Sequence, residues 1–201
     1  MEEIAPGIVR WTARHPNLGV EVSSYLLVEE GVVLDPMVPP EGLDALREHG
    51  EVAHVVLTNR HHDRDSARFV EAFGCPVHVV RQGLHEYEGK KLEVTPFDFG
   101  GGLPGGLKAH AVYEKWPDEG AIEIPRARAL AIADGTIRYG EELSFVPDHL
   151  LGDDPEEAKR GLREAYARLA DEVEPEVLLL AHGDPVIGDG ADALRRFAQQ
   201  S

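Results

Sequence analysis

Residues 55–66 read VVLTNRHHDRDS, an apolar run followed at once by a dense group of polar side chains. The apolar run at 55–57 is typical of a strand that is buried on both faces. It stops abruptly and is followed by two histidines, two aspartates and two arginines. Polar groups at the end of such a strand lie where open α/β sheets usually bind their ligands. The stretch therefore predicts a functional site directly after a buried strand.

Two later stretches have the same layout. The apolar residues 129–133 are followed by Asp134, and the apolar residues 177–181 are followed by His182. In each case a strand pattern ends in a side chain that can bind a metal ion. We therefore expect the three strand ends to meet in space, with the rest of the chain as the scaffold that brings them together.

The length of 201 residues and the 42% hydrophobic content predict a single domain, residues 1–201, with a sizeable core. No apolar run approaches the ~20 residues of a membrane span. The acidic N-terminus lacks the charged and apolar segments of a signal peptide. The single cysteine, Cys75, cannot form an internal disulfide, as is usual in a reducing compartment. We expect a cytoplasmic protein without a membrane segment.

The net charge of −17 argues against nucleic-acid binding, because that function normally needs a basic surface that displaces counterions. A compact basic site that includes Arg60 and Arg64 could still attract a small anion. The expected partner is therefore a small-molecule substrate. The composition is compatible with a homo-oligomer and does not determine one.

The first half of the chain alternates strand and helix patterns, which predicts parallel strands with helices outside them. The expected helices are residues 43–50 and 67–73, and the second of these ends at Gly74. The two strands around the turn at 29–31 are expected to form a hairpin. The expected strands are residues 7–13, 22–28, 32–35, 53–57 and 76–80.

From residue 91 the pattern changes to strands with little helix between them. The glycine-rich segment 100–106 lacks the Lys-Ser/Thr ending of a phosphate loop and is expected to be a flexible hairpin connection. Asp154, followed by a proline and two glutamates, predicts a helix start, and a last helix is expected at 191–199. The expected strands are residues 92–95, 107–113, 121–124, 128–133 and 177–181.

The candidate metal ligands are His61, Asp63, Asp134 and His182. Two imidazoles and two carboxylates suit Zn²⁺, Fe²⁺ or Mn²⁺, and we expect one divalent ion, zinc before the other two. A site without thiolates that keeps open coordination positions is typical of catalytic zinc. Because His62 alternates with His61 along the chain, we expect it to face away from the site.

The same residues, in this order and spacing, resemble the motifs of the metallo-β-lactamase-fold hydrolase superfamily. Residues 57–64 are similar to its Thr-His-x-His-x-Asp-His loop, residues 133–135 to its Thr-Gly-Asp segment, and residues 181–185 to its Gly-His-Gly-x-Pro segment. Residues 25–35 resemble its opening hairpin. The resemblance covers nearly the whole chain. It implies a mixed α/β protein, an αββα sandwich with a metal site at one edge.

The metal motif is degenerate, however. Asn59 and Arg64 stand where the fuller motif has histidines, so that the loop reads Asn-x-His-x-Asp-Arg, similar to the mono-zinc subclass of metallo-β-lactamases. Residues 112–120, where the motif has a further histidine, contain none, and Glu114 is the alternative ligand there. The first metal site of the family thus keeps only His61 of its three histidines. The second site keeps Asp63, Asp134 and His182.

These features predict a hydrolase that uses a single metal-activated water on a small ester, thioester, lactone or phosphoester. In this interpretation Asp63 and His61 are catalytic, and His61 acts as general base or orients the water. Arg64 or Arg60 would bind a substrate carboxylate or phosphate. The alternative role of these arginines is a salt bridge to Asp65 or to another acid.

The missing histidines motivate a second hypothesis, a catalytically inactive family member that acts as a binding or interaction protein. In that case Asp63, Asp134 and His182 would be joined by hydrogen bonds or salt bridges. The guanidinium of Arg64 would then lie between Asp63 and Asp134, in the space of the ion. An iron-dependent relative that handles oxygen or sulfur is a third, weaker hypothesis, because it calls for a fuller ligand set.

Overall fold

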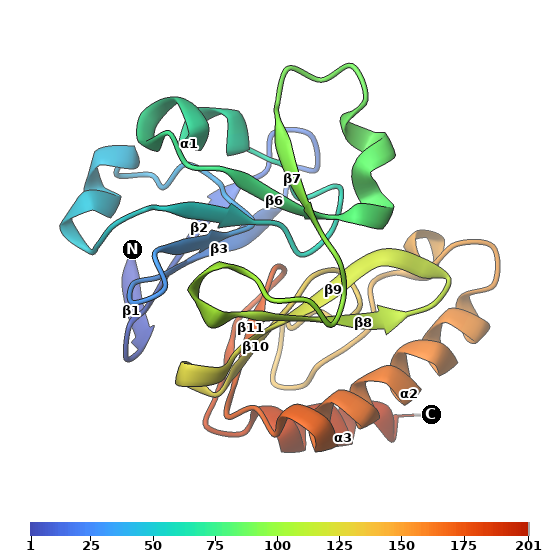
Figure 1. Cartoon of the computed structure of the whole chain (residues 1–201). Helices are drawn as coiled ribbons and strands as arrows, with labels where there is room; N and C mark the ends of the chain where they lie inside the picture. The colour runs from blue at the N-terminus through green and yellow to red at the C-terminus, as the bar shows by residue number, and fades with distance from the viewer. Residues whose placement is uncertain (201) are drawn as a thin grey trace.

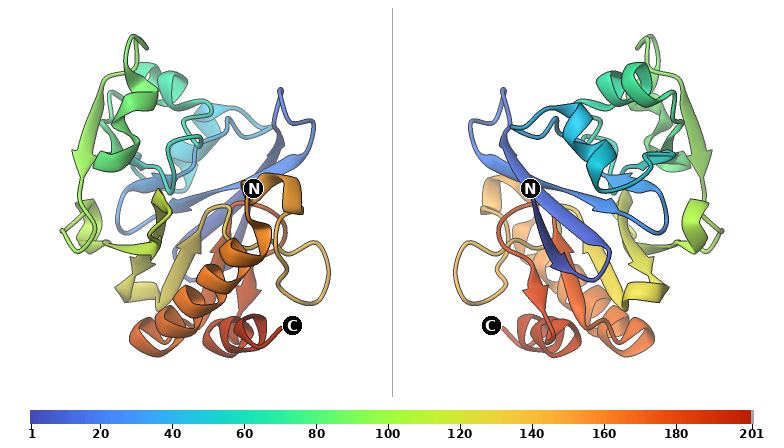
Figure 2. Two further views of the ribbon diagram at one scale, coloured as in Figure 1. Left: turned by 90° about the vertical axis from the view of Figure 1, so that its right-hand side faces the viewer. Right: turned by 90° about the vertical axis from the view of Figure 1, so that its left-hand side faces the viewer.

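Two β-sheets are stacked face to face in the computed structural model, which describes residues 1–200, and helices cover the outer side of each sheet (Figures 1 and 2). Helix α1 (Ser66–Phe73) lies outside the first sheet, and α2 (Pro155–Val173) and α3 (Gly190–Ala198) lie outside the second. The arrangement is the αββα sandwich that the resemblance implies.

The first sheet contains seven strands in the order of the chain. The strands up to β4 pair antiparallel and those from β4 to β7 pair parallel, so that the predicted hairpin and the predicted parallel strands are both confirmed. The strands are β1 (Glu2–Ala5), β2 (Ile8–Arg14), β3 (Glu21–Leu27), β4 (Val32–Leu34), β5 (His54–Val56), β6 (Val77–Val80) and β7 (Val94–Phe97).

The second sheet has five strands in the order β12-β11-β10-β9-β8. Only β10 and β11 run parallel, with Ile132 opposite Leu180 at their ends. Because parallel strands end at the same edge of a sheet, the residues that follow them emerge side by side. The strands are β8 (Lys108–Tyr113), β9 (Trp116–Ile124), β10 (Ala129–Ile132), β11 (Val177–Leu180) and β12 (Val186–Ile187).

The helices begin and end where their sequence signals indicate. Helix α1 ends at Gly74, which has φ 66. The carboxylate of Asp154 caps α2 by accepting the N–H of Glu157 at 3.0 Å. The helix expected at 43–50 is a 3-10 helix. No helix in residues 1–200 is long and apolar enough to span a membrane. The 3-10 helices are η1 (Leu43–Glu48), η2 (Arg81–Tyr87), η3 (Pro104–Gly106), η4 (Pro125–Ala127) and η5 (Asp148–Leu150).

Three apolar layers hold the sandwich together. Phe69 of α1 packs in the layer outside the first sheet, and Val56 and Leu179 lie in the layer between the sheets. Tyr166 of α2 and Phe197 of α3 fill the layer outside the second sheet. Both faces of each sheet are thus covered, which explains why β4, β10 and β11 read as uninterrupted apolar runs.

The glycine-rich segment corrects one expectation. It does not join a hairpin, because β7 pairs with β6 in the first sheet whereas β8 pairs with β9 in the second. The segment carries the chain from one sheet to the other. Gly105 has φ 68, and a Cβ atom there would lie 2.6 Å from the Cβ of Glu30, so that this position requires glycine.

We expect Phe197→Ala to lower the free energy of unfolding by about 3–5 kcal/mol, because truncation leaves a cavity. Phe197 is fully buried, with ring centroids 5.8 Å from Tyr166 and 4.5 Å from Phe145. Urea unfolding followed by circular dichroism measures the change. Gln199→Ala, on the exposed side of the same segment, serves as control and should change stability by less than about 0.5 kcal/mol.

Candidate functional site

Three side chains meet at the edge where β5, β10 and β11 end. His62, Asp134 and His182, called the central cluster below, each offer one ligand atom within 4.8 Å of the other two. Nε2 of His182 lies 3.0 Å from Oδ1 of Asp134, and Nε2 of His62 lies 3.3 Å from the same oxygen. Two imidazole nitrogens therefore converge on one carboxylate oxygen.

The two sheets are fastened to each other at this edge. The N–H of Ser23 in β3 donates to the carbonyl of Ala181 at 2.9 Å, and the hydroxyl of Tyr25 donates to the carbonyl of Leu180 at 2.7 Å. These bonds hold the end of β11 against the first sheet. They bring His182 and Asp134, from the second sheet, to the loop after β5 that carries His62.

Asp35, at the end of β4, orients His62. Its buried carboxylate accepts the N–H of Thr58 at 2.8 Å and the hydroxyl of Thr58 at 2.6 Å, and lies 2.9 Å from Nδ1 of His62. Nδ1 is thereby occupied and Nε2 faces Asp134, the arrangement in which a carboxylate orients a metal-binding histidine. Sequence reasoning missed Asp35, although it ends an apolar run, 32–34, as Asp134 does.

Charges inside the central cluster compensate one another. Burial lowers the pKa of His62, but the carboxylates of Asp35 and Asp134 outweigh it and raise this pKa to about 9. Burial opposes the charge on Asp134, but His62 and His182 hold the pKa of that carboxyl well below its usual range. Without an added cation, His62 is therefore a protonated histidine between the carboxylates of Asp35 and Asp134.

A buried glutamate, Glu119 of β9, stands behind Asp134. Its Oε1 accepts the N–H groups of Asp134 at 2.9 Å and of Gly135 at 2.8 Å. Burial and the neighbouring Asp134 raise the pKa of Glu119 to about 8. Glu119 lies in the region 112–120, where the family motif has a further histidine, but nothing in the local sequence pattern indicates a functional role for it. Glu114, the alternative ligand in that region, is exposed in the turn after β8.

Solved structures resemble this chain over almost its whole length, whereas no family model matches the sequence and no curated protein is significantly similar. The metallo-β-lactamase DIM-1 exposed to ceftazidime has 13% identity and a TM-score of 0.72, with 98% of this chain and 95% of that chain covered. A metallo-β-lactamase from Pontibacter korlensis has 16% identity and a TM-score of 0.67, with 100% and 98% covered. The chain has the metallo-β-lactamase fold.

The same fold occurs in proteins of other names. The rubredoxin oxygen:oxidoreductase from Desulfovibrio gigas has 18% identity and a TM-score of 0.66, with 98% of this chain and 59% of that chain covered. Identities of this size establish a shared architecture and transfer no activity. The function must therefore be argued from the side chains of this metallo-β-lactamase fold.

Two of the predicted ligands lie outside the central cluster. Oδ2 of Asp63 is 2.9 Å from Nζ of Lys90, and His61 is exposed. The expectation that His62 faces away is wrong, because residues 59–65 form turns in which the alternation of a strand does not apply. The N–H of His62 donates to the carbonyl of Asn59 at 3.3 Å, closing one of these turns.

The two arginines are engaged by the protein itself. Arg60 forms an ion pair with Asp118, which is the alternative role expected for it. Nη1 of Arg64 donates to the carbonyls of Ser23 at 2.7 Å and Asp35 at 2.8 Å. Within residues 1–200, Arg64 has no ion pair shorter than 4.0 Å. The guanidinium of Arg64 therefore does not lie between Asp63 and Asp134, where it is expected for an inactive family member.

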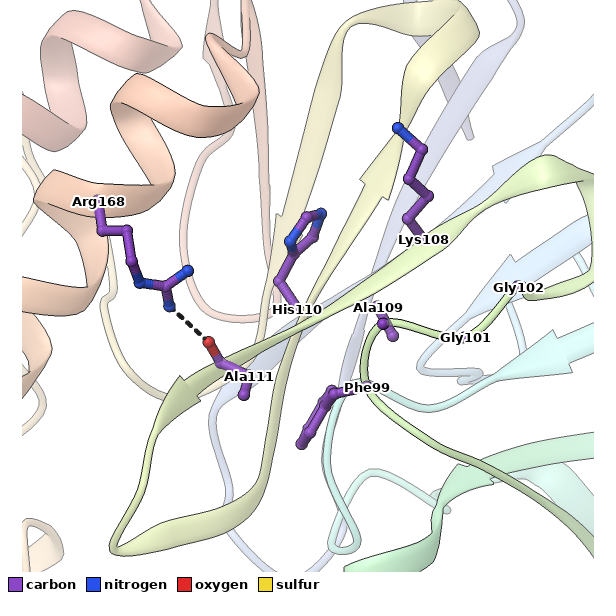
Figure 3. Close-up of a pocket in the computed structure, with 9 residues that line it drawn as sticks. Phe99, Gly101, Gly102, Lys108, Ala109, His110, Ala111 and Arg168 are labelled. Atoms are coloured by element: carbon purple, nitrogen blue, oxygen red, sulfur yellow. Dashed lines mark hydrogen bonds between the residues drawn. The ribbon is translucent and has the colours of Figure 1, made fainter.

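A cavity of about 530 Å³ lies elsewhere in this fold, along the outer edge of β8 (Figure 3). Its basic side chains are already paired. Lys108 and His110 contact Glu123 at 2.8 and 2.7 Å, and Arg168 donates to the carbonyl of Ala111 at 2.8 Å. None of its lining residues belongs to the central cluster. The candidate functional site is therefore the cluster and not this cavity.

We expect the His62 imidazole of the metal-free protein to titrate near pH 9, above its ordinary value of 6.5. A raised folded-state pKa contributes stability that is complete below about pH 6.5 and is lost as the pH rises through about 9. NMR titration of the histidine ring protons measures the pKa. Asp134→Asn should lower it, and a midpoint near 6.5 in the unsubstituted protein would contradict the arrangement described.

Proposed function

We propose that this chain is a metal-dependent hydrolase in which His62, Asp134 and His182 hold a single divalent ion. The observation that carries the proposal is the convergence of two Nε2 atoms, at 3.0 and 3.3 Å, on Oδ1 of Asp134. Ligands that share one zinc ion at about 2.0–2.2 Å lie at similar distances from one another. Asp134 and His182 keep the roles expected from the sequence, and His62 takes the place expected for Asp63.

The donor set fits a catalytic ion. Two imidazoles and one carboxylate, without thiolate, leave a coordination position open for water or substrate, and they suit zinc, iron or manganese. Metal-binding histidines usually donate their other ring nitrogen to a carboxylate, which orients the ring, and Asp35 accepts such a bond from Nδ1 of His62. A divalent ion at this place would supply Lewis acidity and a more acidic bound water.

The surrounding residues would orient the substrate and move protons. His61, exposed on the loop that carries His62, is the proposed group that exchanges a proton with the substrate. Arg60 pairs with Asp118 through Nη1, and the rest of its partly exposed guanidinium is the proposed contact for a substrate carboxylate or phosphate. Asp63 would help to keep this loop in place through Lys90. The proposed substrates are small esters, thioesters, lactones or phosphoesters.

The fold by itself would permit other metal chemistry, since structures of the same fold include an oxygen:oxidoreductase. The hydrolase is preferred because the central cluster offers three protein ligands around one position. A single ion with an open position is sufficient to activate water. Hydrolysis therefore requires no more ligands than the three that the central cluster offers.

Protein purified without chelator should contain ~1 equivalent of a transition metal, and His182→Ala and Asp134→Asn should lose most of it because each removes a ligand. His110→Ala, at the separate cavity beside Glu123, is the matched control and should keep the metal. Elemental analysis gives the content, and a panel of esters, thioesters, lactones and phosphoesters gives the activity with and without chelator.

The proposal predicts that chelation abolishes hydrolysis and that one of zinc, iron or manganese restores it. Less than ~0.1 equivalent of metal in the unsubstituted protein, with no hydrolysis after any of these ions is added, would contradict it. Metal content that survives His182→Ala would place the ion elsewhere.

A further inference from the structure

Glu119 is a buried acidic residue that the proposed function leaves without a role. Its exposed fraction is 4%, and it lies on β9 directly behind the turn that carries Asp134. Its Oε1 accepts two successive backbone N–H groups, those of Asp134 and Gly135, at 2.9 and 2.8 Å. Successive N–H groups of a turn form a concave anion site, and this one is filled by a side chain of the same protein.

The amide of Asn59 links Glu119 to the side chain of Asp134. Nδ2 of Asn59 donates to Oδ2 of Asp134 at 2.8 Å and lies 3.4 Å from Oε2 of Glu119. The carbonyl oxygen of the same amide accepts the N–H of His61 at 2.9 Å, which fixes which way the amide points. Oδ2 of Asp134 is therefore occupied, and Oδ1 is left for the two histidines.

The turn has no room to move on its other side. A Cβ atom at Gly135 would lie 2.1 Å from the hydroxyl oxygen of Tyr166, a fully buried residue of α2. That hydroxyl has no hydrogen-bond partner in residues 1–200. The backbone at 134–135 is thus confined between the carboxylate of Glu119 and the ring of Tyr166.

From these contacts we propose that Glu119 is a positioning residue of the metal centre, which holds both the backbone and the side chain of Asp134 in the ligand orientation. The inference rests on the proposed function. Capping the turn does not by itself explain the residue, because Oε2 of Glu119 also accepts from the amide of Asn59, and that amide orients Oδ2 of Asp134.

The test compares three substitutions that separate the length of the side chain from its acidic group. Glu119→Gln keeps the length and an oxygen that can accept both N–H groups, but it removes the acidic group. Glu119→Asp keeps the acidic group and is one methylene too short to hold the turn. Glu119→Ala removes both. Glu123→Gln, on the same strand with its carboxylate paired to Lys108 and His110, is the matched control.

Metal-free forms of all five proteins are titrated with Co²⁺, followed by its visible absorption, and with Zn²⁺ by calorimetry. Glu119→Asp and Glu119→Ala should bind both ions about 10–100-fold more weakly, which is the usual effect of losing such a partner. The Co²⁺ spectrum should change in position as well, since Asp134 is no longer fixed. Glu119→Gln should show a smaller loss, and Glu123→Gln none.

Affinity and spectrum equal to those of the unsubstituted protein in both Glu119→Asp and Glu119→Ala would overturn the positioning role and leave the proposed function standing. An unsubstituted protein that binds neither ion would overturn both proposals. Circular dichroism of the metal-free forms monitors folding. If Glu119→Ala does not fold, Glu119→Asp and Glu119→Gln decide the question, because each keeps one property of the carboxylate.

Discussion

The buried carboxylate of Asp35 is the constraint on which the edge of the sandwich depends. A charge with 3% exposure must be fully hydrogen-bonded, and its partners are the backbone and hydroxyl of Thr58 and the ring of His62. Meeting that requirement bends the chain after β5 into turns and aims Nε2 of His62 at Asp134. The central cluster is therefore built from the first sheet outward, and the second sheet supplies the other two side chains.

The two-sheet architecture is what the resemblance to the metallo-β-lactamase fold implies. The sequence itself is sufficient to predict the buried strands and the helices, because β4, β10 and β11 are apolar throughout and α1 and α2 carry their own end signals. It also predicts that Asp134 and His182 meet, since both follow strands of one apolar type. It does not predict which histidine of the adjacent pair points inward. That choice is made by Asp35, which lies 27 residues before His62. The position of Glu119 behind Asp134 and the crossing of residues 100–106 between the sheets also depend on contacts between residues that are far apart in the sequence.

Asn59 shows how the site accommodates the departure from the fuller family motif. Where that motif would have a histidine, this chain has an amide that donates between two carboxylates, with Nδ2 at 2.8 Å from Asp134 and 3.4 Å from Glu119. A neutral donor shared in this way offsets part of the repulsion between the two acids. An amide that forms hydrogen bonds thus stands where the fuller motif has a ligand.

The glycine-rich crossing divides the chain into two consecutive halves, one for each sheet. His62 belongs to the half that leaves the ribosome first, and Asp134 and His182 belong to the half that follows. A nascent chain that has reached only residue 100 therefore cannot possess a complete cluster, and it has no partner for the inner face of its sheet. Any ion held by all three residues binds only the assembled pair, so that its binding energy is added directly to the association of the halves.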